Sequence, residues 1–199
     1  LAMAFAAQAA IAIENARLYT AERQSRLELK SIQDTAVALS AELQPDTLLD
    51  MIVSEAARAF HAEAVSLMLW DKTESQLVVK ANCGLTDGYA QLQRIPRERV
   101  DAVLAPDGKL RPVYTADLTS TPFGDRDLIV GEGLRSVLSV PLYRTDLSGI
   151  LNIYSKGDIR AFSPAQIELA ETFAAQATIA IENARLYQAE REQRTLAEA

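Results

Sequence analysis

Residues 134–154 read LRSVLSVPLYRTDLSGILNIY, and this stretch decides the fold. Two apolar runs, residues 134–143 and 147–154, flank the polar segment Arg144-Thr145-Asp146. Runs of β-branched, apolar and aromatic residues on either side of a short polar loop are typical of an antiparallel hairpin. We therefore expect two paired strands here, with Pro141 at a bulge or an edge position near the end of the first strand.

A second hairpin and a short strand are predicted upstream. Residues 64–70 (AVSLMLW) and 76–83 (QLVVKANC) are joined by a polar loop, and residues 112–116 form a shorter apolar run. Residues 84–111 lack a firm period, and we interpret them as loops with one or two short helices. Residues 117–132 are predicted to be a polar loop.

Helices are predicted on both sides of the strands. Pro45 suits the first position of a helix, where its missing N–H costs nothing, and an amphipathic apolar stripe follows it. The last helix begins with a capping box formed by Ser163 and Gln166, with Pro164 as its first residue. This helix has no breaker for more than 30 residues, which corresponds to roughly 50 Å at 1.5 Å per residue.

The beginning of the chain repeats its end. Residues 1–26 (LAMAFAAQAAIAIENARLYTAERQSR) and residues 169–194 (LAETFAAQATIAIENARLYQAEREQR) are identical at 20 of 26 positions. We expect residues 1–44 to be the end of a preceding domain plus a coiled-coil linker, within a tandem array. The heptad positions are Ile11, Leu18, Ser25, Ile32 and Leu39, joined later by Leu29, Ala36 and Leu43.

Composition argues against several classes of function. The chain has 199 residues and a net charge of −7 without a basic stripe, so we expect no binding to nucleic acid. The single cysteine, Cys83, excludes an internal disulfide and a CxxC zinc site and fits a reducing cytoplasm. The longest apolar stretch, residues 1–13, is shorter than the roughly 20 residues that a bilayer requires. We expect a cytoplasmic protein without direct membrane contact.

The order of these elements resembles a GAF domain. The resemblance implies an α+β fold, in which an antiparallel sheet of five or six strands has the N- and C-terminal helices on one face. It also implies a pocket under loops and short helices on the other face, a core over residues 45–165 and a C-terminal signalling helix over residues 163–199, with long helices extending from both ends. A PAS domain is the alternative fold. The matching segments are residues 48–71, 77–85, 111–118, 134–142, 148–156 and 162–187.

The resemblance further implies a small-molecule site. Strand alternation places Leu67 on the face expected to pack on helices and Met68 on the opposite face. A pocket needs apolar walls with a few polar anchors, and the residues around its expected position supply both. The candidate ligand-binding residues are Ser66, Met68, Asn82, Cys83, Tyr89, Asp117, Phe123 and Ser136.

The chemistry of the ligand stays open. Family members that bind cyclic nucleotides carry an Asn-Lys, Phe, Asp-Glu signature, and here Ser155-Lys156, Phe162 and Gln166-Ile167 stand at the matching places, so we do not expect a cyclic nucleotide. Four arginines near the expected pocket cover form either a solvated loop or a rim that attracts a carboxylate or phosphate. These are Arg94, Arg97, Arg99 and Arg111.

We expect no catalysis and no metal. His61, the only histidine, lies at the end of a helix, where a surface or capping role is expected. No carboxylate cluster has the spacing of metal ligands, and Cys83 has no second cysteine for redox chemistry. We leave the cofactor unassigned.

The sequence as a whole predicts a regulatory module that senses a small molecule or the packing of a dimer. The terminal helices would form a homodimer and pass the signal to an output domain. The resemblance implies a parent such as a bacterial sensor kinase or a nucleotide cyclase. The alternatives are a structural dimerisation module without a ligand and a thiol-based enzyme on the same scaffold.

Overall fold

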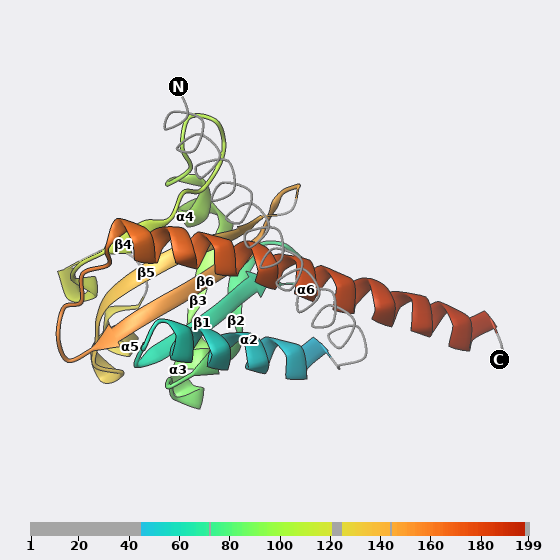
Figure 1. Ribbon diagram of the computed structural model, residues 1–199, viewed down its shortest axis with the longest axis horizontal. Coiled ribbons are helices and arrows are strands. Elements are labelled where there is room, and N and C mark those ends of the chain that lie inside the picture. Colours follow the sequence, from blue (N-terminus) through green and yellow to red (C-terminus); the bar gives the residue numbers. More distant parts are fainter. Residues whose placement is uncertain (1–44, 72, 121–124, 144, 198–199) are drawn as a thin grey trace, which may run out of the picture. The chain divides into compact units, whose positions relative to one another are not determined.

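In the described part of the chain, six strands form one sheet in the order β3-β2-β1-β6-β5-β4 (Figure 1). The computed structural model describes residues 45–71, 73–120, 125–143 and 145–197, so the predicted connecting helix, residues 1–44, lies outside it. All neighbouring strands are antiparallel, which confirms the predicted fold class. The strands are β1 (Ala64–Trp70), β2 (Gln76–Cys83), β3 (Arg94–Pro96), β4 (Val113–Thr115), β5 (Leu134–Tyr143) and β6 (Leu147–Lys156).

Both predicted hairpins are confirmed. β1 pairs with β2 and β5 pairs with β6, and β6 continues two residues beyond the expected end at residue 154. β1 and β6 lie at the centre of the sheet, where Gly149 allows them to approach closely. A Cβ atom at Gly149 would lie only 2.2 Å from the Met68 carbonyl oxygen. Glycine is therefore required where the two central strands meet.

β3 is a strand that the sequence does not predict. Its three residues fall in the segment interpreted as loops and short helices, and they pair with residues 76–78 at the edge of the sheet. Arg94 and Pro96 are exposed and Ile95 is partly buried, and three residues are too few for this alternation to predict a strand. Proline is tolerated here because an edge strand leaves one side of its backbone unpaired.

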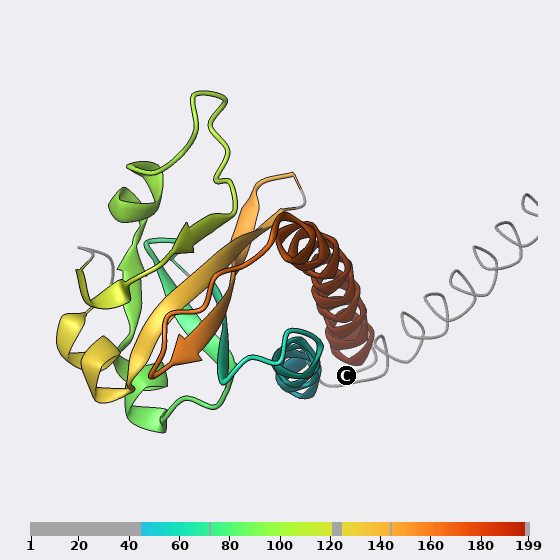
Figure 2. The ribbon, with the colours of Figure 1, turned by 60° about the vertical axis from the view of Figure 1, so that its left-hand side comes forward.

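Two helices cover one face of the sheet (Figure 2). α2 (Pro45–Ala59) and α6 (Pro164–Ala197) enclose the largest apolar core between themselves and the strands. The rings of Phe60 and Phe173 meet edge to face, with their centroids 6.1 Å apart. The strands contribute fully buried residues such as Leu67, Leu151 and Ile153 to the same core. The predicted alternation in β1 is confirmed, since Leu67 belongs to this core and Met68 to a cluster on the other face.

α6 begins with the predicted capping box. The Ser163 N–H donates to Gln166 Oε1 at 3.0 Å, and the Gln166 N–H donates to Ser163 Oγ at 3.3 Å. The helix has 34 residues, about 50 Å at 1.5 Å per residue. From Arg185 to Thr195 its described side chains are exposed, so only its first part packs on the sheet. The buried residues on that part are Ala170, Ala174, Ala177, Thr178, Ile181 and Ala184.

The end of α2 explains the role of His61. His61 has a φ of 47°, in the left-handed region, and its N–H donates to the Arg58 carbonyl. The next N–H, of Ala62, donates to the Ala57 carbonyl at 2.8 Å. This pair of bonds is a Schellman motif, which closes the C-terminus of a helix. His61 is exposed at this cap, in agreement with the capping role expected from the sequence.

Short helices lie on the opposite face of the sheet (Figure 2). They come from the segments before β3, before β4 and before β5. Among the helices that the structure describes, none combines the length and the apolar character needed to cross a bilayer. The short helices are α3 (Asp87–Leu92), α4 (Arg97–Asp101), the 3-10 turn η1 (Leu118–Ser120) and α5 (Arg126–Gly131).

Candidate functional site: a cavity under the short helices

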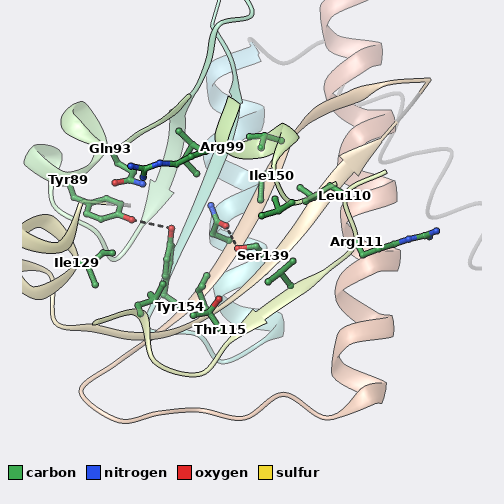
Figure 3. A pocket seen from close by; sticks show the side chains of 17 residues that line it. Tyr89, Gln93, Arg99, Leu110, Arg111, Thr115, Ile129, Ser139, Ile150 and Tyr154 are labelled. Carbon is green, nitrogen blue, oxygen red and sulfur yellow. Dashed lines mark hydrogen bonds between the residues drawn. The ribbon is translucent and has the colours of Figure 1, made fainter. Parts of the chain in front are cut away.

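A cavity of about 130 Å³ lies between the sheet and the short helices (Figure 3). β5 and β6 supply residues to its floor, and α3, α4, α5 and the segment around β4 supply its walls. The walls are mostly apolar, as ligand pockets commonly are. The apolar lining includes Ile95, Val100, Val103, Leu110, Ile129 and Ile150.

A row of hydrogen-bonded polar side chains, here called the polar row, crosses the floor. Ser139 Oγ donates to Asn152 Oδ1 at 2.7 Å, and Asn152 Nδ2 donates to Ser66 Oγ at 3.2 Å. The Tyr154 hydroxyl lies 3.2 Å from Ser66 Oγ and 3.3 Å from the Tyr89 hydroxyl. The polar row thus joins β5, β6, β1 and α3, and its members satisfy one another.

The two tyrosines of the polar row stay protonated at neutral pH. Burial raises the pKa of Tyr89 far above its ordinary value, and the adjacent Tyr154 adds to the shift. Burial also raises the pKa of Tyr154, although its hydrogen bonds with Ser66 and Tyr89 oppose the shift. Both hydroxyls are therefore neutral hydrogen-bonding groups and not bases.

Gln93 and Arg99 lie together on one side of the cavity, near Tyr89 (Figure 3). Gln93 caps the C-terminus of α3, where its N–H donates to the Tyr89 carbonyl at 2.8 Å. Its side chain is buried, and Oε1 has no hydrogen-bond partner among the described residues. Arg99, from α4, is exposed and forms no ion pair or hydrogen bond with any described residue.

The other three arginines of the sequence cluster have partners elsewhere. Arg94 donates to the carbonyls of Ala90 and Gln93, and Arg97 lies over the Trp70 ring at 4.1 Å. Arg111 lines the cavity but pairs with Asp107 at 2.6 Å, and its guanidinium extends away from the cavity (Figure 3). The four arginines thus do not form one rim, and Arg99 is the cation that remains available at the cavity.

A partly buried ion pair holds the short helices to the end of β6. Lys156 Nζ donates to the Gly84 carbonyl at 2.6 Å and to Glu132 Oε2 at 3.2 Å. Glu132 Oε1 accepts from both the N–H and the hydroxyl of Thr86, the residue that caps α3. Burial alone would raise the pKa of Glu132, but the Thr86 hydrogen bonds and the Lys156 ammonium outweigh it and hold the pKa below its usual value.

The predicted site residues occupy different places around this cavity. Tyr89 lines it and also belongs to the polar row. Ser66 is fully buried in the polar row beneath the lining, and Asn82 lies opposite Ser66 on the neighbouring strand. Met68 is fully buried in an apolar cluster that also contains the lining residues Val100, Leu110 and Ile150.

Three of the four remaining predicted residues lie away from the lining. Cys83 is half-buried and packs against the core on the helix-covered face of the sheet. Asp117 accepts from Thr119 and lies 4.0 Å from Arg135, while Phe123 is outside the described residues. Ser136 is buried and bonded to Ser155 and to the backbone of Arg160, so it anchors the loop that precedes α6.

The sequence contains a signal for the floor of the cavity and, in Tyr89 and the arginine cluster, a partial signal for its wall. Ser139 and Asn152 each interrupt an apolar stretch of their strand, which indicates a polar patch within the sheet. Gln93 and Arg99 fall in a segment without periodicity, and only the folded chain brings them together. No group of three or more His, Cys, Asp or Glu residues that could hold a metal ion exists in the described ranges.

A wider groove of about 420 Å³ lies at the other end of the sheet, between the hairpin tips and α6. Six of its thirteen lining residues are charged, with acidic and basic side chains facing the same space. Its lining is more polar than that of the smaller cavity, so the smaller cavity is the better candidate for a ligand. The charged lining residues are Asp71, Glu74, Lys80, Asp146, Glu182 and Arg185.

The fold and the cavity define a class of protein: an α+β domain with terminal helices on one face of its sheet and a ligand-sized cavity on the other. The family model of the GAF domain matches residues 44–181, well over half of the chain. The chain therefore belongs to the GAF domain family, as its sequence suggests. A search of curated proteins gives no match.

Solved structures share the fold at low sequence identity. The GAF domain of a phosphoenolpyruvate-protein phosphotransferase from Coxiella burnetii aligns with a TM-score of 0.61 and 21% identity, covering 82% of this chain and 98% of its own. A domain of a protein described as a two-component sensor histidine kinase, from Sinorhizobium meliloti, aligns with a TM-score of 0.60 and 21% identity. The alignment covers 71% of this chain and 93% of that domain. The second GAF domain of DevS from Mycobacterium smegmatis aligns with a TM-score of 0.52 and 23% identity. The alignment covers 76% of this chain and 99% of that domain.

Proposed function

We propose that this chain is a regulatory module without catalytic activity, which binds a small molecule in the cavity and transmits the change through α6. The observation that carries the proposal is that the cavity and α6 lie on opposite faces of the same strands. In β5, a strand that contacts α6, Ser139 lines the cavity, and its neighbours Leu138 and Val140 belong to the core that α6 covers. A ligand that displaces β5 therefore displaces the surface on which α6 rests.

The chemistry of the cavity supports a binding role over a catalytic one. Its two tyrosines are neutral, and the described residues place neither His61 nor Cys83 in its lining. A nucleophile with an adjacent base is the usual requirement for covalent catalysis, and this lining does not supply that pair. The rival of a thiol-based enzyme would have to use Cys83 from the opposite face of the sheet.

The proposed parent is a bacterial sensor protein with more than one such module. One solved relative belongs to a protein described as a two-component sensor histidine kinase, and another is the second GAF domain of its protein. The repeat of residues 1–26 at 169–194 supports a tandem array joined by coiled-coil helices. In this proposal residues 1–44 are the connecting helix, residues 45–165 the core, and residues 163–199 the signalling helix.

The exposed side of α6 supports a homodimer. Leu169, Ile179 and Leu186 are each more than half exposed, and Tyr187 is 45% exposed. Large apolar side chains recurring along one helix are typical of a surface that packs on a second helix. A second copy of this chain, related by a two-fold axis, would bury the same residues from both partners.

Sedimentation equilibrium over a range of concentrations tests the dimer. The wild-type chain should self-associate, and Ile179→Glu or Leu186→Glu should weaken the association at least tenfold, because each buries a charge in the interface. Val130→Glu is the matched control, since Val130 is 55% exposed on α5 and should not alter association. A wild-type chain that stays monomeric at about 100 μM, or variants that associate normally, would contradict the proposed dimer.

A thermal-shift screen of small molecules, followed by hydrogen exchange, tests the sensing role. A molecule that raises the unfolding temperature should also change amide exchange in α6, although α6 contributes no residue to the cavity. A screen without any binder would favour the structural dimerisation module. Binding that leaves exchange in α6 unchanged would exclude the relay.

A further inference from the structure

Gln93 Oε1 is a buried acceptor that the protein does not satisfy. Gln93 is 5% exposed and lines the cavity. Among the described side chains only one other fully buried polar atom lacks a partner, Arg135 Nε, and Arg135 does not line the cavity. Leaving a buried acceptor unpaired is unfavourable, so this position favours a ligand that donates a hydrogen bond.

The polar row, in contrast, offers little to a ligand. Asn152 already donates to Ser66 and accepts from Ser139, and the Tyr154 hydroxyl lies between two other hydroxyls. A ligand resting on this floor would therefore meet polar groups that already have partners. Its own polar atoms should lie at the other side of the cavity, where Gln93 and Arg99 are found (Figure 3).

Gln93 and Arg99 together have a definite hydrogen-bonding pattern. The unpartnered oxygen of Gln93 accepts one hydrogen bond, while the guanidinium of Arg99 only donates. The complementary group carries an N–H donor beside a carbonyl acceptor, as in a primary amide, a lactam or an imide. A carboxylate lacks the donor and would place its negative oxygen against Gln93 Oε1.

We infer that the cavity binds a compact, mostly apolar molecule that ends in an amide-type group, whose N–H meets Gln93 Oε1 and whose carbonyl meets Arg99. The inference rests on the proposed ligand-binding function and specifies the class of ligand. The volume sets the size, because an apolar cavity of about 150 Å³ holds benzene. At about 130 Å³, this cavity accommodates a body of about one six-membered ring.

Three probes of nearly equal shape separate the possibilities: benzamide, acetophenone and benzoate. Benzamide has the donor and the acceptor, acetophenone has the acceptor alone, and benzoate has two charged acceptors. Dissociation constants come from titrations of the whole 199-residue chain followed by NMR. Benzamide should bind about tenfold more tightly than acetophenone, and benzoate more weakly than benzamide.

Gln93→Leu tests the donor contact directly. The variant should bind benzamide and acetophenone equally, because the acceptor that distinguishes them is gone. Its unfolding temperature should not fall, since the substitution removes an unpartnered buried oxygen. Gln91→Leu is the matched control, because Gln91 is exposed on the same helix outside the lining, and it should keep the preference for benzamide.

Arg99→Leu tests the acceptor contact. The variant should weaken the binding of benzamide and of acetophenone by a similar factor of about five, because both probes carry the carbonyl. Arg126→Leu, an exposed arginine outside the lining, makes the same change in net charge and should have no effect.

Two patterns of probe binding would overturn the inference. One is benzoate as the tightest probe, which would identify an anion site. The other is a ratio of benzamide to acetophenone binding that is near one in the wild type or unchanged in Gln93→Leu. If none of the probes binds while the thermal-shift screen finds other molecules, the ligand class is wrong and the sensing role stands. If no molecule binds, both proposals fail.

Discussion

The two faces of this sheet are built from the same strands but are packed differently. The helix-covered face has one continuous apolar core, to which α2, α6 and four of the strands contribute. The cavity face has two smaller apolar clusters, one around Tyr154 and one around Met68. On the cavity face, a row of buried polar side chains and an open volume replace part of the packing.

Strand alternation makes this division possible. Successive side chains of β6 point to opposite faces, so Leu151 and Asn152 can be adjacent in sequence and belong to different environments. The helix-covered face can therefore supply stability while the cavity face retains polar groups and space. We therefore expect most substitutions on the helix-covered face to reduce stability, and substitutions on the cavity face to affect ligand binding as well.

The largest expected change in the free energy of unfolding comes from truncating one buried side chain on each face. Leu151→Ala should reduce the free energy of unfolding by about 4 kcal/mol, because Leu151 is fully buried in the large core. Ile150→Ala should cost about 2 kcal/mol, because Ile150 already borders the cavity and loses fewer contacts. Urea denaturation followed by circular dichroism measures both. Equal losses would show that the two faces are packed alike.

The next effect concerns the ion pair on the cavity face. Glu132→Gln should lower stability at pH 7 by about 2 kcal/mol, because Lys156 loses its charged partner. The folded-state pKa of Glu132 is depressed, so its contribution is present above the usual value of about 4.5 and is lost as the pH falls through the folded pKa. The difference from wild type should therefore shrink below pH 4.5.

The exposed Asp158→Asn variant serves as the control for this titration, because Asp158 follows Lys156 closely and its side chain lies in solvent. It should show little difference from wild type at either pH. A constant gap between Glu132→Gln and wild type from pH 7 to pH 3 would argue that the carboxylate charge does not hold the short helices in place.

The smallest effect is expected at the cap of α2, on the helix-covered side. His61→Gly should raise the free energy of unfolding by about 0.5–1 kcal/mol, because glycine adopts a positive φ without the steric cost that other residues have. His61→Ala should give no such gain, since alanine retains the Cβ atom. Thermal unfolding of the two variants decides the point, and an equal effect would mean that the imidazole itself matters.

The sequence predicts the framework of the fold because its signals are local. The two hairpins follow from apolar runs around short polar loops, and the start of α6 follows from Ser163 and Gln166, whose reciprocal bonds form within four residues. β3 is not predictable in this way, because its three residues become a strand only when β2 offers an edge. Its pairing is a property of the folded sheet.

The candidate site, like the fold, is predictable from the sequence only where its signals are local. Tyr89 and Ser66 could be selected from the sequence because strand alternation and the family pattern place them near the pocket. Gln93 and Arg99 lie in an aperiodic segment, and their importance depends on an absence of partners that only three-dimensional contacts reveal. Cys83 is a predicted site residue that lies away from the cavity. It follows Asn82 in the sequence but packs on the helix-covered face.

The small residues beneath α6 have a mechanical consequence. Ala170, Ala174, Ala177 and Ala184 present only methyl groups to the strands, so at these four positions the contact has low relief, while Phe173 and Ile181 are large side chains of α6 that enter the core. A leucine at one of these positions would fit between side chains of the strands and would have to leave that position before α6 could shift along its axis. A row of methyl groups keeps most of its dispersion contact during a small axial displacement. In the proposed relay, Phe173 and Ile181 therefore set the resistance of α6 to a small axial displacement, and the four alanines add little to it.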